Sequence, residues 1–166
     1  MLLLIHNAFK LYNDYGLNKT IFVGNNKMGL VYADIELINI IDVEMAKKHF
    51  IGEEEIKRMH LNMLADSGAY MMSINENIQS ILQLPFIEKR KAILADGSIA
   101  EYNTVGPIMV KFKNRTAICT AFVLPGDAEP LLGAIPMEEM DVLIHPNKQE
   151  LVVNPEHPEY AVLKMK

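Results

Sequence analysis

The feature that most constrains the fold is a series of short apolar segments, beginning at Leu30, that are separated by turn-forming residues. In the first segment the apolar side chains occupy every second position, at Val31, Ala33, Ile35 and Leu37. This spacing matches a β-strand with one buried face, because successive strand side chains point to opposite sides of the sheet. The sequence therefore predicts an all-β fold with a few short helices.

Further strands are predicted at residues 56–65, 92–94, 99–102, 108–112, 117–124, 142–144 and 151–153. Asp96-Gly97 favours a hairpin tip between the second and third of these, because both residue types tolerate turn conformations. Turns at Asn114-Arg115 and at His145-Pro146-Asn147 make two more antiparallel pairs. Residues 131–133 form a short apolar strand that ends in glycine.

Three short helices complete the prediction. We expect Asp42 to cap a helix that runs to about Phe50, because an aspartate side chain accepts hydrogen bonds from the first free backbone amides. Asn75 is expected to cap a second helix, which carries Ile78, Ile81 and Leu82 and ends before Pro85. The third covers residues 135–140, and the acidic residues 53–55 are interpreted as a solvated face.

Length and composition suit one domain in a reducing compartment. A chain of 166 residues buries a sizeable core without cross-links, and its single cysteine, Cys119, forms no internal disulfide. We expect a cytoplasmic protein without cofactor or metal, since the five histidines lack ligand spacing. With a net charge of −5 and no basic stripe or signal peptide, neither nucleic acid nor membrane is an expected partner. The predicted division is an extension at 1–27, a domain at 28–154 and a tail at 155–166.

The candidate catalytic residue is Asp66, which follows an apolar strand and begins the segment Asp66-Ser67-Gly68-Ala69. A carboxylate on such a glycine-containing loop can meet its own copy across the two-fold axis of a symmetric dimer. Two facing carboxylates hold one proton between them, so the pair contains an acid and a base that activate water. Taken alone the triplet is also compatible with a simple turn, and it arises by chance in roughly one chain of this length in ten.

The surrounding order resembles the retropepsin-like family of aspartic peptidases, which includes the retroviral proteases. The resemblance extends from Leu30 to about Asn154 and rests on three motifs in the same order. These are the apolar strand entering Asp66-Ser67-Gly68-Ala69, a flap-like hairpin at Asp96-Gly97-Ser98, and Leu131-Leu132-Gly133 before a short helix. Serine stands where threonine is commoner in the family, and the segment between Asp42 and Glu55 has no counterpart in the smallest members.

The resemblance implies an acid-protease barrel that contributes one half of an active site, and therefore a homodimer that hydrolyses peptide or protein substrates. By this resemblance Asp66 is catalytic, while Ser67 braces the two loops across the dimer and Gly68 and Ala69 shape the loop. The flap residues Asp96, Gly97 and Ser98 face the substrate. Leu132 and Gly133 support the catalytic loop. No metal, nucleotide or covalent intermediate is involved.

The sequence leaves three alternatives to this interpretation open. Asp96, Asp127 and Asp141 are other acidic candidates, but the first two lie in turns where aspartate bonds locally, and the third lacks a following Ser/Thr-Gly. The chain could also be a dimeric binding module that uses the same fold without proteolysis. A third alternative is self-processing of residues 1–27, and Met28 is a second candidate start for translation.

Overall fold

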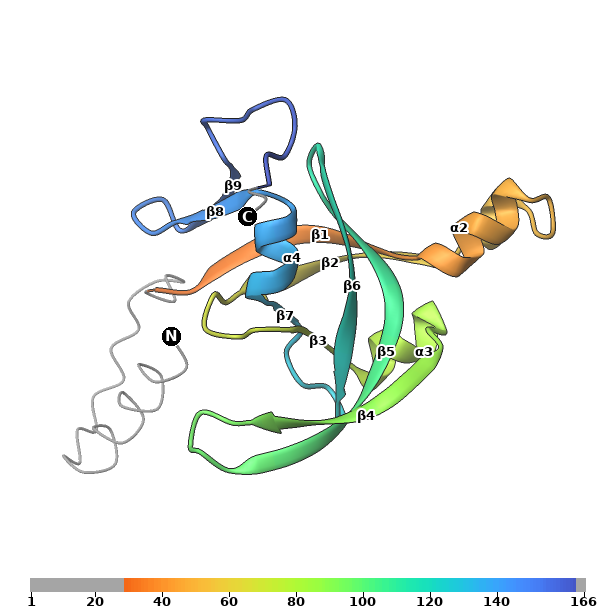
Figure 1. The fold of residues 1–166 in the computed structure, drawn as a ribbon, viewed down its shortest axis with the longest axis horizontal. Helices are drawn as coiled ribbons and strands as arrows, with labels where there is room; N and C mark the ends of the chain where they lie inside the picture. Colours follow the sequence, from red (N-terminus) through yellow and green to blue (C-terminus); the bar gives the residue numbers. More distant parts are fainter. Residues whose placement is uncertain (1–28, 164–166) are drawn as a thin grey trace, which may run out of the picture.

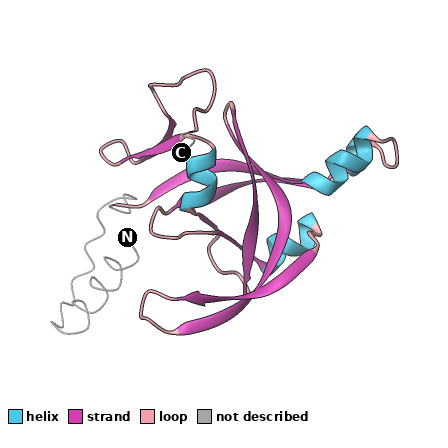
Figure 2. Cartoon of the chain, in the orientation of Figure 1, coloured by secondary structure: helices cyan, strands magenta, loops and turns pink. Residues whose placement is uncertain are grey.

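The computed structural model describes residues 29–163, and β-strands dominate this part of the chain (Figures 1 and 2). The predicted all-β class with a few short helices is confirmed. The elements, in chain order, are β1 (Val31–Asn39), α2 (Ile40–Lys47), the 3-10 turn η1 (Glu53–Glu55), β2 (Arg58–Ala65), β3 (Met72–Asn75), α3 (Glu76–Leu82), β4 (Phe86–Ile93), β5 (Ile99–Phe112), β6 (Arg115–Leu124), β7 (Leu131–Leu132), α4 (Ala134–Glu139), β8 (Val142–His145) and β9 (Glu150–Val153).

Seven strands form one mixed sheet in the order β1-β2-β7-β3-β6-β5-β4. Strand β1 also pairs with β5, so the pairings return to the first strand and the sheet is partly ring-like, with β4 outside the ring. Most neighbours are antiparallel, but β2 with β7 and β3 with β6 are parallel. Apolar side chains from every strand of the ring fill its interior, among them Ile35, Met63, Ile74, Ile108, Ala121 and Leu132.

The alternation in the first strand has the predicted consequence, since Val31, Ala33, Ile35 and Leu37 are all buried. The predicted pairing of residues 142–144 with 151–153 is also confirmed, because Val142 lies opposite Val153 in a separate two-stranded sheet. The prediction of separate strands at 99–102 and 108–112 was wrong. A bulge between Val105 and Ile108 accommodates Gly106-Pro107, so one strand of 14 residues, β5, continues through them.

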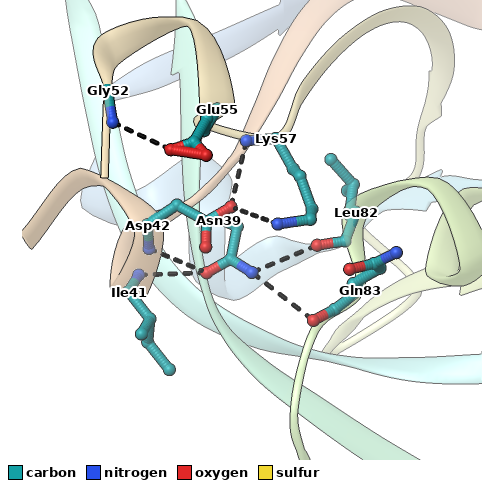
Figure 3. Close-up of polar contacts among 8 residues, drawn as sticks. All are labelled: Asn39, Ile41, Asp42, Gly52, Glu55, Lys57, Leu82 and Gln83. Carbon is teal, nitrogen blue, oxygen red and sulfur yellow. Dashed lines mark hydrogen bonds and ion pairs between the residues drawn. The ribbon is translucent and has the colours of Figure 1, made fainter. Parts of the chain in front are cut away.

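The helix after β1 begins earlier than predicted, and its cap is Asn39 rather than Asp42. The Asn39 side-chain oxygen accepts hydrogen bonds from Ile41 N (3.0 Å) and Asp42 N (3.4 Å) (Figure 3). Asp42 lies inside the first turn instead, where its carboxylate accepts from the backbone and side-chain nitrogens of Lys57 at 3.0 and 3.2 Å. An asparagine immediately before the helix precedes Asp42 in the chain, and it takes the capping position.

Asn39 also joins two helices. Its side-chain nitrogen donates to the carbonyl oxygen of Leu82 at 3.1 Å and to that of Gln83 at 3.5 Å, which lie at the end of α3 (Figure 3). One buried side chain thus satisfies the free amides at the start of α2 and a free carbonyl at the end of α3. Helix α2 itself extends away from the sheet (Figure 1).

The second helix begins as predicted, because Asn75 accepts a hydrogen bond from Ile78 N at 3.0 Å. Ile78 and Leu82 are buried, whereas Ile81 is 51% exposed and does not join the core. The helix ends at Leu82, where Gln83 adopts a left-handed conformation ahead of Pro85. Glu53, Glu54 and Glu55 are exposed, as predicted for a solvated face.

The segment after β9 folds back on the domain through Asp141. This carboxylate accepts from Asn154 Nδ2 (2.8 Å) and Val162 N (3.1 Å) and lies 2.6 Å from His157 Nδ1. The predicted tail at 155–166 is therefore attached to the domain over its described part. The predicted extension at 1–27 lies outside the described residues.

Candidate active site

The turn that contains Asp66 is held at the end of a pair of parallel strands. Ala65 closes β2 and lies opposite Leu132 of β7, and Asp66 N donates to Leu132 O at 3.0 Å. The same β7 strand also pairs with β3, which follows the turn, at Ser73 and Leu131. Strand β7 therefore lies between the two strands that flank the turn, and their backbone bonds define where Asp66 is placed.

Asp66 is only 2% exposed, although it is an acidic residue. Its Oδ1 accepts a hydrogen bond from Gly68 N at 2.8 Å, and its backbone oxygen accepts from Ala69 N at 3.2 Å. These two bonds close a tight turn over Ser67 and Gly68, both of which are exposed. A buried carboxylate is costly unless it is hydrogen-bonded, and the Gly68 amide supplies such a bond to Asp66.

Leu132 and Gly133, predicted to support this turn, lie directly against it. A Cβ atom on Gly133 would lie 2.4 Å from Met71 O and 2.9 Å from Ala69 O, distances that real Cβ atoms do not reach. The chain then continues with Ala134 N donating to Ala69 O at 2.7 Å and Ile135 N donating to Tyr70 O at 3.1 Å. Absence of a side chain at position 133 permits this close contact between backbones.

The predicted flap is the β4–β5 hairpin, whose tip contains Asp96, Gly97 and Ser98. Asp96 Oδ1 accepts from Ser98 N (2.9 Å) and Ser98 Oγ (2.6 Å), and Gly97 has a φ of +82°. The tip therefore has the local bonding expected of a turn aspartate. In Figure 1 the hairpin tip and the loop after β2 point toward the same side of the molecule but are separate from each other.

One contact joins the hairpin to the segment after the Asp66 turn. Arg90 Nη1 of β4 lies 4.0 Å from Met71 Sδ, and Arg90 Nε donates to Glu88 Oε1 at 2.6 Å. Sequence reasoning did not single out Arg90, because a basic residue among Lys89 and Lys91 has no distinguishing pattern. Only the strand pairing shows which of these three side chains lies on the side of the loop.

Other reactive side chains do not join Asp66. Burial and the nearby Glu139 raise the pKa of the Cys119 thiol to about 12, so it stays protonated at neutral pH and is a poor nucleophile. Hydrogen bonds from Asn154 and the Val162 amide, with smaller contributions from His157, lower the pKa of Asp141 to about 2. Asp141 is thus a permanently charged structural group at the base of the tail.

Two of the pockets on the described surface lie near the Asp66 turn and along α2. One, of about 240 Å³, is next to the Asp66 turn and lies between β3, β6 and α4; it is lined by Met71, Met72, Ile118, Cys119, Thr120, Ile135 and Pro136. The other, of about 430 Å³, is lined largely by α2 and the residues after it. Asp66 lines neither of them.

Within residues 29–163, no three His, Cys, Asp or Glu side chains gather in a way that would hold a metal ion. None of the helices in this range is long and apolar enough to cross a membrane. Comparisons with models of protein families and with curated proteins found no match for this chain.

Proposed function

We propose that the chain is an aspartic endopeptidase of the retropepsin type, whose active site is completed by a second copy of the same chain. The observation that supports this proposal is the Asp66 turn: a buried, hydrogen-bonded carboxylate at the end of β2, packed against Leu132-Gly133. A turn with a merely local role does not require a buried acid. The partly ring-like sheet around it is compatible with the acid-protease barrel that this proposal requires.

The chemistry follows from two such carboxylates facing each other. Like charges at short distance do not both ionise, so the pair retains one proton across a wide pH range. The ionised member accepts a proton from a bound water, whose oxygen attacks the carbonyl carbon of the peptide bond. The protonated member donates a hydrogen bond to the carbonyl oxygen. A proton then passes to the leaving nitrogen as the carbon–nitrogen bond breaks.

A second chain is needed because the other aspartates of the described chain are engaged elsewhere or exposed. Asp34 is exposed on β1, and the remaining four bond to other side chains: Asp42 to Lys57, Asp96 to Ser98, Asp127 to Asn77 and Asp141 to His157. None of these repeats the Asp66 environment of a strand end beside a close-packed glycine. We therefore propose that the acid and the base come from two copies of Asp66.

Substrate would enter between the β4–β5 hairpin and the Asp66 turn as an extended peptide, adding its backbone to the strands around it. Because Asp66 is only 2% exposed in the single chain, the segments around it must move before a peptide reaches the carboxylate. With one cysteine in the chain, we place this activity in a reducing cytoplasm.

The decisive test is Asp66→Asn, which keeps the size of the side chain and removes the ionisable group. Purified protein would be incubated with a diverse peptide library between about pH 4 and pH 7, and cleavage read by mass spectrometry. We expect the parent to cleave and the variant to lose at least about a thousandfold in rate while remaining folded. Asp34→Asn, the same change at an exposed position, is the matched control and should cleave like the parent.

Two results would contradict the proposal. Undiminished cleavage by folded Asp66→Asn would remove Asp66 from the mechanism. A parent protein that binds peptides from the library but cleaves none would identify a binding module instead.

A further inference from the structure

The β4–β5 hairpin has two chemically different faces. Along β5, Ala100, Tyr102 and Thr104 are partly or fully buried, whereas the alternate residues Ile99, Glu101 and Asn103 are exposed. Tyr102 also lies near Phe122 of β6, with ring centroids 5.9 Å apart. We call the Tyr102 face the inner face of the hairpin, because it is the more buried of the two.

Strand pairing assigns the basic residues of β4 to these faces. Arg90 is paired with Tyr102, whereas Lys89 is paired with Asn103 and Lys91 with Glu101. Because directly paired residues share a face, Arg90 lies on the inner face and the two lysines on the outer one. The ion pairs agree, since Lys89 meets Glu101 at 3.7 Å and Arg90 meets Glu88 at 2.6 Å.

Arg90 also reaches the segment that follows the Asp66 turn. Its Nη1 lies 4.0 Å from Met71 Sδ, and the backbone oxygen of Met71 borders Gly133. Gly133 in turn follows Leu132, whose carbonyl accepts from Asp66 N. The guanidinium therefore contacts the side chain of a residue whose backbone borders the glycine that supports the candidate catalytic turn.

The donors of Arg90 are only partly used. A guanidinium carries five N–H donors, of which Nε is engaged by Glu88, while the thioether of Met71 is a weak acceptor. Half of the Arg90 side chain remains exposed. The end of the guanidinium formed by its two Nη atoms therefore has the geometry and charge to bind an incoming carboxylate with two parallel hydrogen bonds.

We propose that Arg90 is a specificity-determining residue that selects an acidic side chain in the substrate peptide, at a subsite beside the Asp66 turn. The inference rests on the proposed peptidase function. An aspartate or glutamate of the extended peptide binds the free end of the guanidinium while Glu88 holds its Nε edge. Lys89 and Lys91 carry the same charge but face away from the turn, so they do not contribute to the choice.

The alternative is that Arg90 and Glu88 form only a solvent-exposed ion pair, which contributes little to stability. The two interpretations differ in the cleavage profile. We would compare parent protein, Arg90→Glu and Lys89→Glu against a peptide library in which each position carries acidic, neutral or basic residues. Lys89→Glu is the matched control, because Lys89 is similarly exposed and also pairs with a glutamate on the same hairpin.

The parent should prefer Asp or Glu at one position of the cleaved peptides. Arg90→Glu should lower kcat/KM for those peptides by about ten- to a hundredfold, mainly through KM, since hydrogen bonds between charged groups contribute at this scale. It should also prefer Lys or Arg at that same position, and this rescue shows that the variant is folded. Arg90→Lys keeps the charge but not the paired donors. Its kcat/KM for the acidic peptides should therefore lie between those of the parent and Arg90→Glu.

Three outcomes decide the inference. A charge-swapped preference in Arg90→Glu with an unchanged profile in Lys89→Glu supports it. A parent that cleaves without acidic preference, or the same profile in Arg90→Glu as in the parent, overturns it while leaving the peptidase proposal intact. A parent with no cleavage at all refutes the proposed function, and this inference with it.

Discussion

Two glycines of this chain occupy their positions for different physical reasons. Gly133 has an ordinary φ of −83°, but a Cβ atom there would collide with the backbone oxygens of Met71 and Ala69. Gly97 at the hairpin tip has a φ of +82° and open space around it. Lack of space demands glycine at the first position, and backbone conformation favours it at the second.

This difference predicts different tolerances. Gly133→Ala should lower the free energy of unfolding by about 1–3 kcal/mol, because backbone atoms must shift to admit the methyl group. The shift falls on the Asp66 turn, so activity should fall as well. Urea denaturation followed by circular dichroism measures the first effect, and peptide cleavage measures the second.

Gly97→Asn is the matched comparison, since asparagine tolerates a positive φ and nothing lies within 4 Å. Its free energy of unfolding should stay within about 0.5 kcal/mol of the parent. If Gly133→Ala proves as stable as Gly97→Asn, the close packing of β7 against the Asp66 turn is not what requires glycine there.

At the scale of elements, one asparagine connects the two helices that interrupt the sheet. Asn39 is 3% exposed; its oxygen caps α2, and its nitrogen reaches the last carbonyls of α3. Next to it, Asp42 and Lys57 tie the beginning of α2 to the segment leading into β2. The position of α2 relative to the sheet thus depends on a few polar bonds and on a small apolar cluster, in which Ala46 and Val43 pack with Ile38 and Ile56.

Asn39→Ala should therefore be unusually damaging for a single polar residue. The lost cap costs about 1 kcal/mol, and the buried Leu82 carbonyl left without a donor costs about 1–3 kcal/mol more. Asn39→Ser separates the two contributions, because serine retains a capping oxygen but has no amide donor. Denaturant midpoints should place the serine variant between parent and alanine; equal midpoints for both variants would show that capping contributes nothing.

At the scale of the whole molecule, the proposed active site belongs to no single chain. The described residues place one buried aspartate beside a close-packed glycine, with Ser67 exposed next to it. An exposed hydroxyl at the edge of the turn is available to a second copy. Assembly and catalysis should therefore be linked through protein concentration.

Activity per chain should fall on dilution, with a midpoint that matches the dimer dissociation measured by analytical ultracentrifugation. Ser67→Ala should move both midpoints to higher concentration if its hydroxyl braces the two loops. Ser80→Ala, at an exposed position on α3, should move neither. A sedimenting monomer that still cleaves peptide would refute the two-chain site.

Much of the strand arrangement could be predicted from local pattern, because alternation and turn chemistry act over a few residues. The buried face of β1, the Asn75 cap and the pairing of β8 with β9 all follow from such short-range signals. The errors arose where neighbouring structure overrides a local preference. The strands predicted separately at 99–102 and 108–112 are joined into β5 by a bulge at Gly106-Pro107, and Asn39 takes the capping position predicted for Asp42.

The sequence by itself determined that Asp66 ends an apolar strand in a tight turn, because strand pattern and the Asp-Ser-Gly order are local properties. No local pattern places Leu132 and Gly133, more than sixty residues later, against that turn; the family resemblance predicted the contact, and the parallel pairing of β2 with β7 produces it. Tertiary structure likewise decided that Arg90 shares a face with Tyr102 and lies near Met71, whereas Lys89 and Lys91 lie on the other face, since the face of a strand residue depends on register with its partner strand. Register and long-range pairing are set by packing of the whole chain, which no local pattern encodes.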